Sequence, residues 1–226
     1  MPSTARYDGV ADYYDENLRE FTLAASETLV ALLGPGPGRV LDLGCGSGLH
    51  FETLQTLGWS VTGLDASVDQ LRIARDRSGE DVELVRGDAA DLPFEDGSFG
   101  AVTAVFVHTD VGDYAAVLAE AARVLQPEGR LVHLGLHPCF TGPFSRYQGP
   151  DEPPFLFPGY RQRAWTKDAP GFGKGLRRIV GAYHVPLADL LNAFVAAGFR
   201  LERFEEPPGH DFPRVLAVVA AQTTRP

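Results

Sequence analysis

Cysteine is scarce in this chain of 226 residues, which contains only Cys45 and Cys139. Two cysteines are too few for a framework of disulfides or for a cysteine-rich zinc site. Long apolar runs are missing as well, since none approaches the roughly 20 residues of a membrane span. The first residues also lack the apolar core of a signal peptide. These absences favour a cytoplasmic setting.

Basic residues are outnumbered, because 20 lysines and arginines stand against 30 acidic residues and give a net charge of −10. A sequence-independent grip on nucleic acid needs clustered lysine and arginine. Anionic membranes would repel such a chain too. We therefore expect neither nucleic acid nor membrane as a partner, and predict a small-molecule substrate bound by a monomer or homodimer.

A short apolar strand runs into three closely spaced glycines at residues 40–48, VLDLGCGSG. Apolar residues without polar alternation indicate a parallel strand buried on both faces. The glycines let the backbone turn sharply and approach a ligand closely. The helix expected to follow points its unpaired N–H groups at the same spot. Taken alone, this stretch predicts a nucleotide-like ligand at the end of a strand.

Strand and helix patterns alternate along the chain. Strands are expected at 40–43, 59–64, 82–86, 99–107 and 129–136, and helices at 49–57, 67–77 and 114–125. This alternation predicts an α/β, Rossmann-like, doubly wound sheet. A helix at 186–197 precedes strands at 199–205 and 215–221, whose connection is too short for a helix. We expect a mostly parallel, seven-stranded sheet that ends in an antiparallel hairpin.

Two segments lie outside this alternation. Residues 1–33 are expected to form an N-terminal helical cap, with one amphipathic helix over 18–33. Residues 137–185 are rich in proline, glycine and aromatic side chains. A loop this long in a compact domain is commonly functional, so we predict a lid-like insertion. The whole chain, 1–226, is expected to be one domain.

Three acids occur at three successive strand ends, namely Asp42, Asp65 and Asp88. Carboxyl ends of neighbouring parallel strands border one crevice, so the three should lie close together. Asp65 suits the hydroxyls of a ribose, and Asp88 with the Ala89 amide suits adenine. Asp42 would repel a pyrophosphate but tolerate a cationic ligand, and the glycine pattern is not that of dinucleotide binders. An oxidoreductase that uses NAD stays as an alternative.

At this point the chain resembles the class I methyltransferases that depend on S-adenosylmethionine, specifically the small ones with a methyltransferase type 11 core. The resemblance covers 7–136 closely, and its matching stretches are 40–48, 61–67, 87–94, 99–102 and 123–131. It implies transfer of a methyl group by in-line displacement to a small molecule. The aromatic-rich insertion favours an aromatic or heteroaromatic acceptor, such as an indole-type or other secondary metabolite. A non-catalytic module that binds S-adenosylmethionine is a further alternative.

The resemblance also implies roles for individual residues. Asp65 would bind the ribose, Asp88 and Ala89 the adenine, and Tyr14 the methionine carboxylate. The glycine loop would pass under the methionine moiety, with backbone groups near Phe106 completing that site. The expected cofactor-binding residues are Tyr14, Asp42, Gly44, Gly46, Gly48, Asp65, Ala66, Asp88, Ala89 and Phe106.

The chemistry is expected from residues across the crevice. The candidate catalytic residues are His108, Tyr183 and His184, and each could equally be a packed structural side chain. The candidate substrate contacts are His137, Phe140, Tyr160 and Trp165, whose alternative role is to pack the lid onto the sheet. No metal is expected, since His133, His137 and Cys139 have no acidic partner nearby. The basic cluster of Lys174, Arg177 and Arg178 is either a solvated helix face or a contact for an anionic group.

Overall fold

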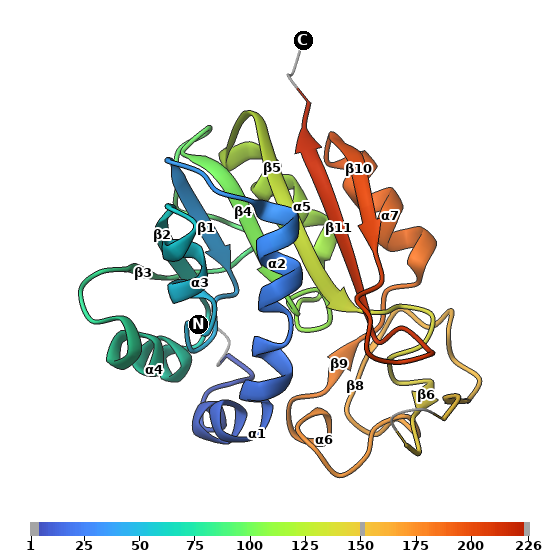
Figure 1. Cartoon of the computed structure of the whole chain (residues 1–226). Helices are drawn as coiled ribbons and strands as arrows, with labels where there is room; N and C mark the ends of the chain where they lie inside the picture. The colour runs from blue at the N-terminus through green and yellow to red at the C-terminus, as the bar shows by residue number, and fades with distance from the viewer. Residues whose placement is uncertain (1–4, 150–151, 224–226) are drawn as a thin grey trace.

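Seven strands form the central sheet of the computed structural model, which describes residues 5–149 and 152–223. They lie in the order β10-β11-β5-β4-β1-β2-β3 (Figure 1). Their bounds are β1 Arg39–Leu43, β2 Ser60–Asp65, β3 Glu83–Arg86, β4 Phe99–Val105, β5 Leu125–Leu136, β10 Phe199–Glu205 and β11 Val215–Gln222. The helices are α1 Ala11–Leu23, α2 Ser26–Leu33, α3 Phe51–Thr56, α4 Val68–Ser78, α5 Tyr114–Val124, α6 Arg177–Val180 and α7 Leu187–Ala196. None of the helices in the described part is both long and apolar enough to cross a membrane.

The pairing of the strands confirms the expected topology. β1 pairs in parallel with β2 and β4, and β2–β3 and β4–β5 are parallel as well. β11 runs antiparallel to both β5 and β10. The carboxyl ends of β1 to β5 therefore open at one end of the sheet, which is where a doubly wound fold binds its ligand.

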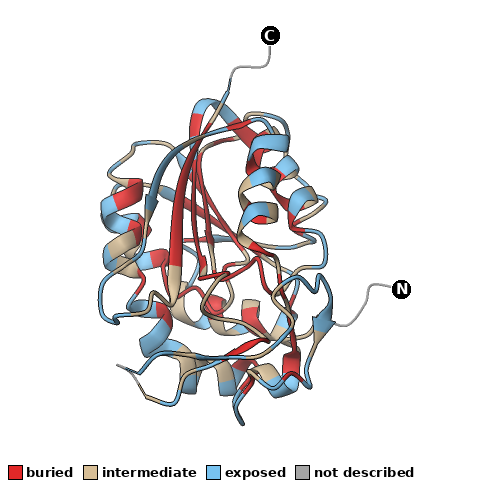
Figure 2. Cartoon of the chain, turned by 90° about the vertical axis from the view of Figure 1, so that its right-hand side faces the viewer, coloured by how far each residue is buried: buried red, intermediate tan, exposed pale blue. Residues whose placement is uncertain are grey.

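Helices cover both faces of the sheet because neighbouring strand residues point to opposite sides. Val40 belongs to a core shared with α2 and α3, whereas Leu41 belongs to a core shared with α5 and α7. Buried residues accordingly run the length of the strands (Figure 2). Phe51 and Phe194, one in each core, are almost completely buried. Each contributes roughly 2–3 kcal/mol of hydrophobic stabilisation.

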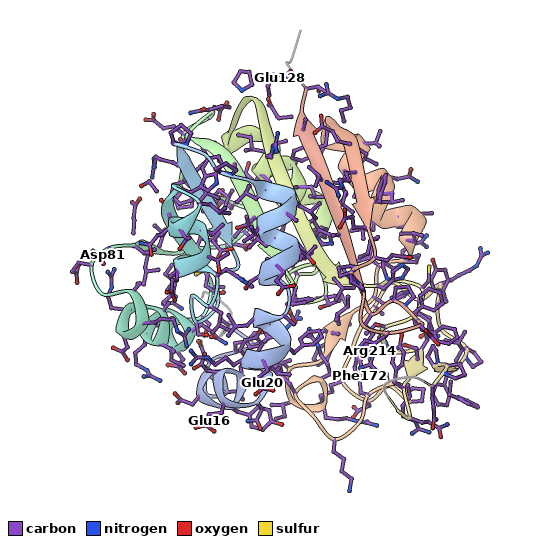
Figure 3. The ribbon with its side chains drawn as sticks, viewed as in Figure 1. Glu16, Glu20, Asp81, Glu128, Phe172 and Arg214 are labelled. Atoms are coloured by element: carbon purple, nitrogen blue, oxygen red, sulfur yellow. The ribbon has the colours of Figure 1, made fainter. Side chains whose placement is uncertain are left out.

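The prediction of a single helix over 18–33 is wrong, because α1 and α2 are separate helices. The Ala25 N–H donates to Thr22 O, three residues back, which tightens the turn between them. α2 then packs on the sheet, whereas α1 lies at the end where the parallel strands open (Figure 1). Glu16 and Glu20 of α1 are exposed on its outer side (Figure 3).

The insertion at 137–185 contains short regular pieces and lies at the same end of the sheet as α1 (Figure 1). Two antiparallel pairs, β6–β7 and β8–β9, accompany α6. Their bounds are β6 Ser145–Arg146, β7 Phe155–Leu156, β8 Trp165–Thr166 and β9 Ala182–Tyr183. The insertion and α1 therefore flank the crevice at the carboxyl ends of the strands.

Candidate functional site

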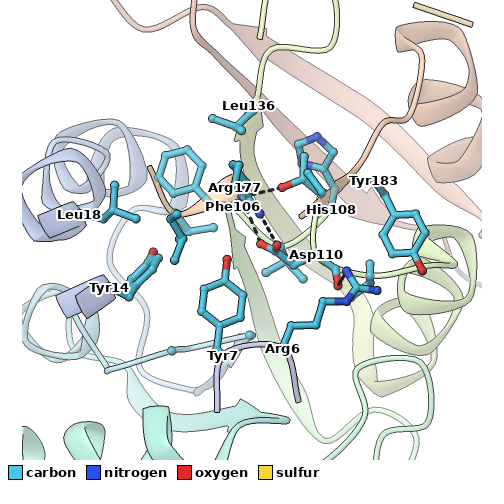
Figure 4. Close-up of a pocket in the computed structure, with 18 of the residues that line it drawn as sticks. Arg6, Tyr7, Tyr14, Leu18, Phe106, His108, Asp110, Leu136, Arg177 and Tyr183 are labelled. Atoms are coloured by element: carbon cyan, nitrogen blue, oxygen red, sulfur yellow. Dashed lines mark hydrogen bonds and ion pairs between the residues drawn. The ribbon is translucent and has the colours of Figure 1, made fainter. Parts of the chain in front are cut away.

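A cavity of about 1360 Å³ lies at the carboxyl ends of β1, β2 and β4. One wall comes from the glycine loop and α1, and the other from the insertion. Tyr7, Tyr14, Phe106, His108 and Tyr183 lie around this common space (Figure 4). The cavity is large enough for a cofactor together with a small molecule.

The glycine loop is built around the Asp65 carboxylate at the end of β2. The Gly46 N–H donates to Oδ2 at 2.9 Å, and the Ser67 N–H donates to Oδ1 at 2.8 Å. Gly46 has a φ of 53°, which strongly favours glycine. Burial is the main cause that raises the pKa of Asp65. Each carboxylate oxygen retains a second lone pair, so Asp65 can still accept hydroxyl groups from a ligand.

Asp42 and Gly48 do not line this cavity, contrary to expectation. Asp42 is buried, accepts a hydrogen bond from Thr103 at 2.8 Å, and borders a hollow of about 30 Å³ behind the glycine loop. Gly48 has a φ of 74°, and a Cβ there would lie 2.5 Å from the Phe51 ring. Gly48 therefore serves the turn and its packing rather than a ligand contact.

Asp42→Asn should change how stability depends on pH. Burial raises the pKa of Asp42 to about 6, so the folded state keeps this proton where the unfolded chain has lost it. Stability from this group therefore falls as the pH rises from about 4 to 7. The variant, which keeps an oxygen for Thr103, should gain roughly 2–3 kcal/mol relative to wild type between pH 4 and pH 7. Urea denaturation across that range measures it.

The matched control is Asp81→Asn, because Asp81 is exposed at the rim of the molecule (Figure 3). Its difference from wild type should stay constant over the same pH range. An equally flat difference for Asp42→Asn would show that burial of Asp42 does not penalise its charge.

Other residues expected to bind the cofactor do line the cavity. Ala66, Asp88 and Ala89 line it beside Asp65. The Asp88 carboxylate accepts the Ala90 N–H at 2.9 Å, which holds the turn after β3. These residues form the edge that the adenosine half of a nucleotide-like ligand would meet.

Tyr14 and Phe106 line the opposite side, next to the glycine loop. Phe106 has a φ of 60°, donates its N–H to Leu134 O at 2.7 Å, and stacks on Phe21 with ring centroids 4.9 Å apart. The Tyr14 hydroxyl lies 3.1 Å from the Thr22 hydroxyl. α1 therefore brings aromatic side chains directly over the end of β4.

All three candidate catalytic residues line the cavity. His108 is 2% exposed, and burial lowers its pKa well below the usual value. The Tyr183 N–H donates to Thr109 O at 2.8 Å, which ties the insertion to the end of β4. His184 Nε2 lies 2.7 Å from Tyr160 O. Because a carbonyl only accepts, this nitrogen carries a proton and Nδ1 holds the lone pair of the neutral ring.

The four expected substrate contacts do not line the cavity. His137 pairs with Glu206 at 2.9 Å and packs on Phe140, 5.0 Å away between ring centroids. The Tyr160 hydroxyl accepts the Leu187 N–H at 3.0 Å. Trp165 donates to Val180 O at 3.2 Å. These rings hold the insertion and α7 in place, which is the packing role weighed against substrate contact.

No group of three or more metal-ligating side chains occurs within residues 5–149 and 152–223. His133 Nδ1 lies 2.7 Å from the Tyr114 hydroxyl, inside the protein. His137 instead faces Glu206. The two histidines therefore have separate partners.

The sequence reasoning missed the polar cluster on the wall opposite the glycine loop. Arg177 of α6 pairs with the Asp110 carboxylate and donates to the Thr109 hydroxyl at 3.0 Å (Figure 4). Arg6 donates to Asp110 O at 3.2 Å and lies over the Tyr183 ring, 4.7 Å from its centroid. The available signal was the acidic Asp110 close behind His108, together with the basic cluster of the insertion.

Comparison with known proteins agrees with this geometry. Residues 41–133 match the family described as a methyltransferase domain. A demethylmenaquinone methyltransferase of Renibacterium salmoninarum is 37% identical over 146 residues, 62% of this chain and 61% of that protein. One from Mycobacterium sp. (strain KMS) is 43% identical over 132 residues, 56% of each. This chain thus spans 56–61% of the length of these two curated relatives.

Solved structures resemble the chain over nearly its full length. An S-adenosylmethionine-dependent methyltransferase from Mesorhizobium loti gives a TM-score of 0.71 at 23% identity, over 91% of this chain and 99% of that one. One from Aquifex aeolicus gives 0.64 at 16% identity, over 94% and 97%. Residues 41–133 therefore match a methyltransferase domain, and the chain has the fold of the class I methyltransferases that use S-adenosylmethionine.

Proposed function

We propose that this chain transfers the methyl group of S-adenosylmethionine to a small molecule with a planar ring. The observation that carries the proposal is one cavity that reaches from the Asp65 carboxylate and the glycine loop to the buried His108. Its first half suits an adenosyl amino acid, and its second half suits an acceptor held against buried side chains. Holding both reactants in one cavity favours a positioned displacement.

The residues of the first half fit the cofactor. Asp65 has acceptor capacity for both ribose hydroxyls, and Asp88 with Ala89 lies where adenine would reach. A Cβ on Gly44 would lie 2.7 Å from Val107, so the close backbone approach at the loop depends on glycine. S-adenosylmethionine supplies an electrophilic methyl group on a good leaving group. The protein then has to hold both reactants in line.

Asp65→Ala should weaken binding of S-adenosylhomocysteine by roughly 1–3 kcal/mol, because the ribose hydroxyls lose their acceptor. The same change strands the Gly46 and Ser67 N–H groups, which loosens the glycine loop. Titration calorimetry measures the loss, and Asp65→Asn, which keeps one acceptor oxygen, should fall between. Affinity equal to wild type in both variants would remove Asp65 from the binding site.

The second half of the cavity favours a flat, largely apolar acceptor. Its apolar lining includes Phe21, Leu136, Phe172 and Leu176, and its polar groups include His108, Asp110, Tyr183 and His184. Aromatic side chains hold planar rings well. The curated relatives named above are demethylmenaquinone methyltransferases, which supports a quinone-type ring ahead of an indole-type one.

The architecture supports a small acceptor. We propose that residues 137–185 act as a lid of a single domain, 1–226, and that residues 1–33 close the opposite side as a cap. A chain of net charge −10 is poorly suited to nucleic acid and to anionic membrane surfaces. A small molecule taken up by a cytoplasmic monomer or homodimer fits these features.

Two assays test the function. Calorimetry with S-adenosylhomocysteine and with NAD distinguishes this proposal from an NAD-dependent oxidoreductase, and we expect binding of the first ligand alone. Transfer of labelled methyl from S-adenosylmethionine to a panel of quinols, phenols and indoles then tests catalysis. Cofactor binding without transfer to any acceptor, together with a stable protein partner in a pulldown, would favour a non-catalytic binding module.

A further inference from the structure

Two buried polar side chains, His133 and Tyr114, lie behind His108, away from the cavity. His133 of β5 is 0% exposed, and Tyr114, at the start of α5, is 4% exposed. The rings of His108 and His133 lie 5.2 Å apart between centroids, and those of Tyr114 and His133 lie 5.5 Å apart. Neither Tyr114 nor His133 lines the cavity. Buried groups of this kind are costly unless paired, so their arrangement needs a reason.

Gly135 makes room for the two imidazole rings to approach. A Cβ on Gly135 would lie 2.4 Å from His108 Nδ1 and 2.6 Å from His133 Nε2. Both nitrogens therefore border the same small space beside β5. Neither nitrogen has a hydrogen-bond partner within the described residues. One bridging water could reach both of them.

The Tyr114 hydroxyl decides which ring nitrogen of His133 carries the proton. It lies 2.7 Å from His133 Nδ1, which is its hydrogen-bond partner among the described residues. If the hydroxyl accepted this bond, its own buried proton would be left without a partner. Tyr114 therefore donates to Nδ1. Burial lowers the pKa of His133 to about 3, so its ring is neutral and carries its single proton on Nε2.

The proton on His133 Nε2 favours one form of His108. It points into the space beside Gly135, where a bridging water that accepts this proton can donate to His108 Nδ1. A neutral His108 that accepts at Nδ1 must carry its proton on Nε2. With Nδ1 buried, Nε2 is the nitrogen that can meet a molecule in the cavity.

We infer that Tyr114 and His133 are positioning residues that hold His108 as the Nε2–H tautomer, so that it donates a hydrogen bond to an oxygen on the methyl acceptor. This deepens the proposed function and rests on it for the identity of the acceptor. The site then selects a ring bearing a carbonyl or phenolate oxygen. In this role His108 orients the ring and stabilises charge on that oxygen, and it does not remove a proton.

Nitrogen NMR on protein labelled in its histidine rings tests the tautomer without any turnover. The chain has six histidines, and loss of one signal set in His108→Gln assigns His108. We expect Nε2 of wild-type His108 to be protonated and Nδ1 to be unprotonated. Protonation at Nδ1 of His108 in the wild type would overturn the inference.

Tyr114→Phe keeps the ring and removes the hydroxyl that donates to His133 Nδ1. We expect the His108 signals to move toward the other tautomer, and kcat with the acceptor to fall roughly tenfold, with the affinity for S-adenosylhomocysteine unchanged. The control is Tyr13→Phe, which changes an exposed tyrosine. It should leave the His108 signals, kcat and the affinity for S-adenosylhomocysteine as in wild type. Unchanged His108 signals in folded Tyr114→Phe would also overturn the inference. If wild type binds no S-adenosylhomocysteine or methylates no acceptor, the proposed function fails while the NMR result still stands.

Discussion

Arg177→Met is expected to lower the free energy of unfolding by about 3 kcal/mol, because it leaves the Asp110 carboxylate without its charged partner. The two side chains are 22% and 19% exposed, so the loss should lie at the lower end of what breaking a buried ion pair costs. Arg177 also donates to Thr109, which joins α6 to the segment after β4. Urea denaturation at pH 7 gives the magnitude.

The neighbouring arginine provides a matched control. Arg178 pairs with Asp168 at the surface, where the side chains are 41% and 81% exposed. Exposed pairs contribute little, so Arg178→Met should change stability by less than about 1 kcal/mol. Adding Asp110→Asn to Arg177→Met should recover part of the loss, because the uncompensated charge is removed. If Arg177→Met and Arg178→Met lowered the free energy of unfolding equally, the ion pair of Arg177 with Asp110 would not stabilise the fold.

His108→Ala is expected to lower kcat by roughly a hundredfold, while the affinity for S-adenosylhomocysteine stays near that of wild type. A group that touches the reacting molecule and is screened from water commonly contributes this much. His108 lines the half of the cavity beyond the glycine loop and makes no hydrogen bond to Asp65 or its partners. Steady-state kinetics together with calorimetry separate the two effects.

His210→Ala is the control, since His210 is exposed and distant in sequence from the cavity residues. It should leave both turnover and cofactor affinity unchanged. Wild-type turnover in His108→Ala would remove His108 from the reaction. A parallel loss of cofactor affinity would instead mean that His108 supports the shape of the cofactor site.

Local patterns along the chain were enough to predict the sheet and to place Asp65 and Asp88 at the cavity. The run of Val40, Leu41 and Leu43 predicts a buried strand because both of its faces are covered by helices. Asp65 and Asp88 follow strands, and parallel strands place such residues at one edge. These features depend on neighbours within a few residues and on a topology that allows few arrangements.

The acceptor side was decided by contacts between segments far apart in the sequence. Arg177 meets Asp110 across 67 positions, and no local pattern distinguishes it from the exposed Arg178. Phe140, Tyr160 and Trp165 are aromatic residues of the insertion, yet they pack within it rather than facing the cavity.

By itself, therefore, the sequence determined the fold class, the ends of the strands and the positions of Asp65 and Asp88 beside the crevice, because the periodicity of apolar residues and the spacing of the acids encode them directly. Only the tertiary structure decided which of the remaining polar side chains face the cavity. It also placed His108, His133 and Tyr114 together beside Gly135. Such juxtapositions depend on how distant segments pack, and a one-dimensional pattern carries no record of which rings will meet.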